Sequence, residues 1–258
     1  FYFLLIYINK KSKSVYRKKP YKKNIFIFGF VFGFGFYLSG ISWITNALTF
    51  DENFTILIPF ALILIPMFLS LFLGFTILLI GPYLKLNLPS LLLFSASLAF
   101  SDYIRAYVLT GFPWNLWAYS TSATNEILQI VNLIGLHSYN LLVITIFTLP
   151  TIIFFKIGKI RKFFSAIFIL FIILSLYIYG NYEINKNKKF LRSIDEKIHV
   201  KIISPNFNLE YGLSKEAVEE RLKKLVRYSD PDKEKKTLFI WPEGVFSGYS
   251  FEEILVFK

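Results

Sequence analysis

The sequence of 258 residues contains no cysteine, one methionine and two histidines. Without cysteine these residues form no disulfide bond and no thiolate metal site. Acidic residues are also scarce, because 29 Lys and Arg outnumber 17 Asp and Glu. Most of the excess basic charge lies in residues 1–180, which carry a net +10, whereas residues 181–258 carry +2. Basic charge between apolar segments is typical of a membrane protein, and we expect no nucleic-acid partner.

Apolar residues are abundant: 55% of the chain is hydrophobic, including 30 Phe. A helix needs about 20 predominantly apolar residues to cross a bilayer. Phe1–Ile8 has the character of the last part of a span, and five further segments have the required length: 24–44, 56–80, 88–108, 129–155 and 163–180. A soluble core rarely contains five such segments with so few charges, so we predict a polytopic α-helical membrane bundle over residues 1–180.

The loops between these segments predict the orientation of the bundle. Asn9–Lys23 contains eight Lys and Arg and no acid, and Lys156–Lys162 contains four basic residues. The loop near Asp51 and the segment Thr110–Leu128 contain no Lys or Arg. Basic loops face the cytoplasm, so residues 181–258 are predicted to lie on the opposite side of the membrane.

The hydrophobic pattern changes after residue 180. Ile198–Ser204 and Thr237–Trp241 predict strands, and Leu213–Ser229 predicts an amphipathic helix that Ser214 can cap. The apolar stripe of this helix is predicted to contain Val218, Leu222, Leu225 and Val226. The order strand, helix, strand predicts a βαβ unit that opens an α/β domain.

Glu243 follows the second predicted strand by two residues, within Trp241-Pro242-Glu243-Gly244. Functional groups of α/β sheets gather beyond the carboxyl ends of the strands. Taken alone, a Glu before Gly is most often a solvated turn residue. The alternative is a general base that removes a proton from a nucleophile elsewhere in the chain.

Three motifs carry a resemblance to a known family. The first is a glycine-rich stretch, Gly29–Phe36 followed by Ser39–Trp43; the second is Asp102-x-x-Arg105 followed by Thr110–Trp114; the third is Trp241-Pro242-Glu243. In this order, and over nearly the whole chain, they resemble the apolipoprotein N-acyltransferase family. The Thr-Gly-Phe-Pro-Trp sequence is the most specific of the three.

The resemblance implies a multi-pass enzyme of the bacterial inner membrane whose periplasmic segment, from residue 181, begins a nitrilase-like (CN hydrolase) αββα domain. It implies a Glu-Lys-Cys triad in which Glu243 is the catalytic base, with no metal and no cofactor. Its substrates would be a phospholipid acyl donor and the lipidated N-terminus of an apolipoprotein. The Lys and Cys are expected beyond Lys258, so we expect a fragment truncated at both ends and inactive as it stands.

Four further residues are candidates for substrate contact. Glu210-Tyr211 stands where the family often has Lys-Trp, so the retained aromatic ring of Tyr211 is a candidate for the acyl pocket. Phe112 and Trp114 form either an aromatic anchor at the membrane interface or a lip for lipid entry. Arg105 lies one helical turn from Asp102, so it forms an ion pair that steadies this loop or binds a phospholipid headgroup.

Two other functions are compatible with the residues. A membrane-tethered nitrilase-like amidase would use the same triad on a small amide. A transporter with a soluble tail would place several charged or unwound sites deep in its spans, and only the Asp102/Arg105 pair approaches that pattern.

Overall fold

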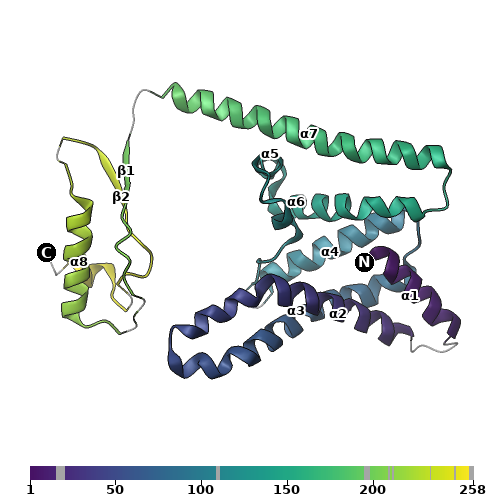
Figure 1. Cartoon of the computed structure of the whole chain (residues 1–258), viewed down its shortest axis with the longest axis horizontal. Coiled ribbons are helices and arrows are strands. Elements are labelled where there is room, and N and C mark those ends of the chain that lie inside the picture. Colours follow the sequence, from purple (N-terminus) through teal and green to yellow (C-terminus); the bar gives the residue numbers. More distant parts are fainter. Residues whose placement is uncertain are drawn as a thin grey trace. The chain divides into compact units, whose positions relative to one another are not determined.

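The computed structural model describes residues 1–15, 21–108, 111–194, 198–208, 210, 212–232, 234–246 and 248–255. The chain divides into two compact units, Phe1–Lys188 and Lys189–Lys258. The first is helical and the second contains the two strands (Figure 1).

The first unit contains helices joined by short connections. Its α-helices are α1 (Tyr2–Val15), α2 (Tyr21–Ile41), α3 (Ile58–Ile80), α4 (Leu88–Tyr107), α5 (Asn125–Leu128), α6 (Val131–Thr148) and α7 (Lys159–Arg192), the last of which continues into the second unit. Its 3-10 helices are η1 (Ser42–Thr49), η2 (Glu52–Leu57), η3 (Gly81–Tyr83), η4 (Trp117–Thr121) and η5 (Leu149–Phe154).

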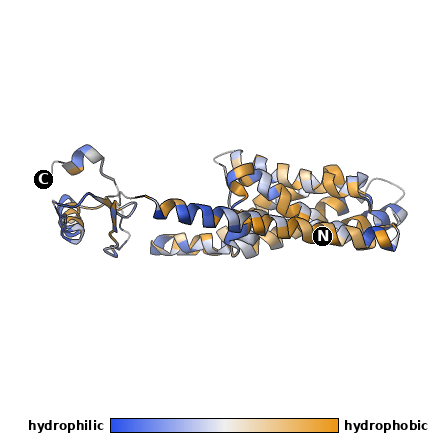
Figure 2. Ribbon diagram, turned by 90° about the horizontal axis from the view of Figure 1, so that it is seen from above, coloured by the Kyte–Doolittle hydropathy of each residue, from blue (hydrophilic) through white to orange (hydrophobic). Residues whose placement is uncertain are grey.

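Within the described residues, four helical stretches have the length and apolar character needed to cross a membrane: Lys22–Thr49, Glu52–Tyr83, Val131–Phe154 and Lys159–Arg192. They coincide with four of the five predicted spans, and Figure 2 shows that hydrophobic residues predominate in the helical unit. The fifth predicted span, 88–108, forms α4 but is not among the four. Its composition differs, since it contains four serines and places Asp102 and Arg105 in its last turns.

Helices α2 and α3 form the most extensive helix pair, lying side by side in Figure 1. Two glycines of the Gly-x-x-x-Gly pattern face α3, because a Cβ at Gly29 would lie 2.8 Å from the Cβ of Ile77, and one at Gly33 would lie 3.2 Å from the Cα of Ser70. The absence of a side chain lets the two backbones approach closely. Gly29 and Gly33 therefore serve the packing of α2 against α3.

Substitution of Gly29 by valine is therefore expected to separate α2 from α3 and to destabilise the first unit by about 1–3 kcal/mol, the usual cost of overpacking. Gly35→Val is the matched control on the same helix, because nothing lies within 4 Å of a Cβ at Gly35. Thermal unfolding of the two variants in detergent micelles measures the difference. Equal unfolding temperatures would contradict the close packing.

Helix α4 packs against both α3 and α6 and supplies much of the buried interior of the first unit. Its start is fixed by Asn87, whose side chain accepts a hydrogen bond of 3.0 Å from the Ser90 backbone N–H. Helix α6 is interrupted at Gly135, where φ is +76°. The predicted span 129–155 contains α6 and η5, and α6 is broken within it because Gly135 adopts a conformation outside the helical region.

The second unit contains β1 (His199–Ile202), α8 (Lys215–Ser229), β2 (Thr237–Ile240) and α9 (Phe251–Leu255). The strands are parallel, with His199 opposite Thr237 and Ile202 opposite Ile240. This arrangement confirms the predicted strand–helix–strand order, and Ser214 caps α8 by accepting a hydrogen bond from the Ala217 N–H. A parallel pair joined by a helix is a βαβ unit.

The buried face of α8 differs from the predicted stripe. Val226 was expected on it but is 48% exposed, whereas Arg221 and Ser229 are buried together with Val218 and Leu225. The buried positions recur at intervals of three and four residues, as one helical face requires, but two of them are polar. Val218 and Leu225 are thus buried as predicted and Leu222 is half-buried, but the buried face includes Arg221 in place of Val226.

Candidate active site

Glu243 lies in the loop that follows β2. Because β1 and β2 run parallel and end opposite each other, the loops that follow them lie at the same edge of the sheet. These loops enclose a pocket of about 160 Å³ that is lined by residues 204, 206–208 and 242–245, with Arg221 of α8. The carboxylate of Glu243 is exposed at this pocket, so it is accessible to a proton donor that enters there.

The backbone on both sides of Glu243 is held in place. Before it, the indole N–H of Trp241 donates a hydrogen bond of 2.9 Å to Oγ of Ser229, at the end of α8. After it, Gly244 adopts a φ of +72°, which favours glycine, and Val245 is buried against Leu225. The motif therefore presents an exposed carboxylate on a loop anchored at both ends.

Arg221 is a residue of this site that the sequence did not reveal. Its guanidinium donates hydrogen bonds to the backbone oxygens of Asn208 and Val245, at 2.9 and 3.2 Å, and pairs with the Glu210 carboxylate at 3.1 Å. Its position on the apolar face, three residues after Val218, is the signal that could have identified it. Tyr211 lies outside the described residues.

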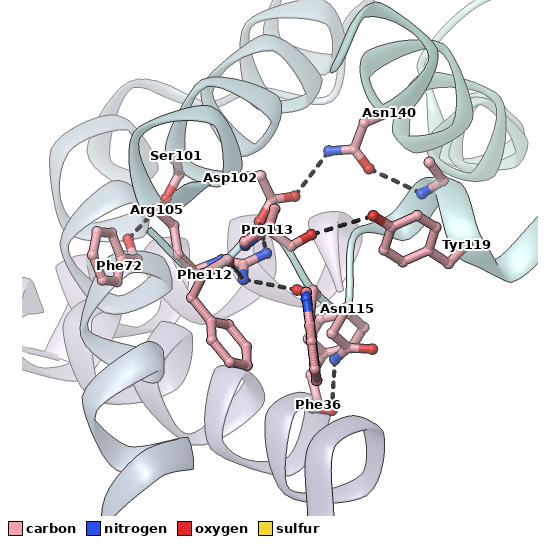
Figure 3. A network of polar contacts seen from close by, with 12 residues as sticks. Phe36, Phe72, Ser101, Asp102, Arg105, Phe112, Pro113, Asn115, Tyr119 and Asn140 are labelled. Atoms are coloured by element: carbon pink, nitrogen blue, oxygen red, sulfur yellow. Dashed lines mark hydrogen bonds and ion pairs between the residues drawn. The ribbon is translucent and has the colours of Figure 1, made fainter. Parts of the chain in front are cut away.

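In the first unit, Arg105 is the largest fully buried side chain and is 1% exposed. Its Nη1 donates to the backbone oxygens of Phe112 and Trp114, at 2.6 and 2.8 Å, and its Nη2 donates to Oδ1 of Asp102 at 3.1 Å (Figure 3). The positive charge thus binds the loop that follows α4. This geometry corresponds to the ion-pair interpretation of Arg105, with the guanidinium directed into the protein.

Asp102 connects the same loop to α6. Its Oδ2 accepts a hydrogen bond of 2.9 Å from Nδ2 of Asn140, which is fully buried, and Oδ1 of Asn140 accepts one of 2.9 Å from the Ala118 N–H (Figure 3). A buried carboxylate is costly unless it is paired and hydrogen-bonded. Both oxygens of Asp102 have partners, so the network fixes residues 112–118 against α4 and α6.

The first and second sequence motifs meet at this loop. Trp43 of η1 stacks on Trp114 with ring centroids 4.8 Å apart, and the two side chains are 50% and 46% exposed. A Cβ at Gly40 would collide with the amide of Asn115, which itself has a φ of +58°. Phe112 is only partly exposed and packs against the core of the unit. The loop therefore presents one exposed pair of stacked indoles on a rigid base.

The fold and the two sites define a membrane protein with an apolar helical unit and a βαβ segment that carries an accessible carboxylate. The family described as "Apolipoprotein N-acyltransferase N-terminal domain" matches residues 3–149. The chain belongs to the apolipoprotein N-acyltransferase family.

Curated relatives named apolipoprotein N-acyltransferase extend this similarity. The protein of Rhodopseudomonas palustris is 25% identical over 227 residues, which cover 84% of this chain and 42% of the relative. That of Rickettsia prowazekii is 29% identical over 218 residues, with the same two coverages. That of Brucella melitensis biotype 1 is 33% identical over 126 residues, covering 48% of this chain and 24% of the relative. The chain thus spans less than half the length of these relatives.

Proposed function

We propose that this chain supplies the membrane unit and the first part of the catalytic unit of an apolipoprotein N-acyltransferase. The acyl group would pass from a phospholipid ester to a cysteine thiolate, with release of the lysophospholipid alcohol. The amine of a lipidated N-terminal cysteine would then attack this thioester, forming an amide and releasing the thiolate. The family match over residues 3–149 is the observation that carries this proposal.

Glu243 is the proposed general base of both steps. It would accept the proton of the thiol and later that of the amine, while a lysine would stabilise the tetrahedral oxyanion. The lysine and the cysteine of the triad would lie beyond Lys258. The exposed carboxylate at a pocket beyond the ends of two parallel strands supports this role, since a base must reach the proton that it removes.

The βαβ unit is proposed to open a nitrilase-like αββα domain on the periplasmic side of the inner membrane. The parallel strands and the connecting helix support the first part of this proposal. The periplasmic side is supported by the basic residues of Asn9–Lys23 and Lys156–Lys162, together with the lack of Lys and Arg near Asp51 and in Thr110–Leu128.

The test is an assay with phospholipid labelled in its acyl chain, applied to an enzyme that contains the full triad. Transfer of label to the enzyme without an acceptor, followed by transfer to a lipidated peptide amine, is the expected result. Release of ammonia from a small amide, without acyl transfer, would identify an amidase. The absence of any label on the enzyme would contradict the proposed function.

Trp114 is proposed to line the entry of the lipid, with Phe112 beneath it and Tyr211 in the acyl pocket. Trp114→Ala is expected to raise KM for the phospholipid several-fold, because the exposed stacked pair with Trp43 would lose half of its apolar surface. Tyr83→Ala is the control, since Tyr83 is an exposed aromatic residue of η3. Reduced membrane insertion of the Trp114 variant, with an unchanged KM, would instead indicate an interfacial anchor.

A further inference from the structure

Arg221 lies on the buried face of α8, between Val218 and Leu225, both of which are fully buried. A charged side chain in such a place is costly unless its donors have partners. The guanidinium meets this requirement mainly with backbone oxygens, which it reaches at 2.9 Å (Asn208) and 3.2 Å (Val245). Its face also lies 5.1 Å from the ring of Phe207.

The partners of Arg221 belong to two different loops. Asn208, with Glu210, follows β1, whereas Val245 follows β2. These are the loops that line the 160 Å³ pocket. One planar group with donors in a fixed fork therefore sets the separation of the two walls of the pocket.

The hydrogen bond from Arg221 to the backbone oxygen of Val245 also holds the loop that carries the Glu243 carboxylate. Val245 is two residues beyond Glu243, its side chain is buried against Leu225, and its backbone oxygen is held by Arg221. Trp241 holds the other side of the loop through Ser229. Both anchors come from α8, so this helix acts as the frame of the Glu243 loop.

We infer that Arg221 is a positioning residue for Glu243: it joins the loops after β1 and β2 and fixes the carboxylate at the pocket. This inference rests on the proposed function of Glu243 as a base. A general base acts only within hydrogen-bonding reach of its proton, and a displacement of about 1 Å can cost about 100-fold in rate. Glu210 contributes less than the two backbone oxygens to holding Arg221, because its side chain is 56% exposed and an exposed ion pair contributes little.

The test compares three variants in an enzyme that contains the full triad, with thioester formation measured per folded molecule over a range of phospholipid concentrations. Arg221→Met is expected to lower the rate at saturating phospholipid about 10–100-fold, with KM changed less than about twofold. Arg221→Lys is expected to restore part of this loss, since a lysine has donors but no planar fork. Arg227→Met, an exposed change on the same helix, is the control and is expected to leave the rate unchanged.

A normal rate of folded Arg221→Met at saturating phospholipid would overturn the inference. If KM were raised at the same time, the result would indicate that Arg221 binds the substrate directly. If Arg221→Met does not accumulate in the membrane, the Arg221→Lys variant provides the test. A wild-type rate for Arg221→Lys would also overturn the inference. Glu243→Gln separates the two proposals. If Glu243→Gln is fully active, the proposed function fails; if it is inactive while Arg221→Met is unimpaired, only the positioning role fails.

Discussion

Replacement of Glu243 by glutamine is expected to lower the rate of thioester formation by at least about 100-fold in an enzyme that contains the full triad. Glutamine has nearly the shape of glutamate but does not accept a proton at neutral pH, so the thiol would stay protonated. Because Glu243 is exposed, the free energy of unfolding should change by less than about 0.5 kcal/mol. The measurement is the transfer of labelled acyl chain from phospholipid to the enzyme.

Glu252→Gln is the matched control for this variant. Glu252 is exposed on α9, nine residues further along the chain, and the substitution removes the same charge. We expect unchanged acyl transfer for this control and equal membrane insertion for both variants. Undiminished transfer by Glu243→Gln would show that the carboxylate is a solvated turn residue, which is the other interpretation of the motif.

The elements that the sequence predicted best are those with a strong local pattern. Four apolar spans and the strand–helix–strand order could be predicted, because long hydrophobic runs and a change of periodicity are visible within a single segment. The segment 88–108 was predicted as a span in the same way and forms helix α4, which also buries Asp102 and Arg105. The break at Gly135 was missed, because an isolated glycine within an apolar run does not reveal its φ.

The parts of the sites that could not be predicted depend on partners distant in the sequence or on backbone atoms. Asn140 reaches Asp102 across 38 residues, and nothing in the sequence joins the two. The acceptors of Arg105 and Arg221 are mostly backbone oxygens, which every residue has. Sequence motifs thus predicted Glu243 as a site residue and Arg105 as a support of the loop after α4. The structure adds Asn140 and Arg221 as further supports.

Substitution of Arg105 by methionine is expected to destabilise the first unit by about 3–5 kcal/mol, the usual cost of breaking a buried ion pair. Asp102 would remain buried with Asn140 but without its positive partner, and the backbone oxygens of Phe112 and Trp114 would lose their donors. Thermal unfolding in detergent micelles and the yield of membrane-inserted protein measure the effect. Arg161→Met, an exposed change at the start of α7, is the control and should have no effect.

The double variant Asp102→Asn with Arg105→Met separates the effect of an unpaired Asp102 charge from the effect of the hydrogen bonds that the loop loses. Removal of both charges leaves no unpaired ion, so the double variant should unfold at a higher temperature than Arg105→Met alone, by the logic of a double-mutant cycle. It should remain less stable than the wild type, since the loop oxygens still lack the guanidinium. Wild-type stability of Arg105→Met would mean that the loop after α4 is held by the stacked Trp43 and Trp114 rings and not by the buried charge pair.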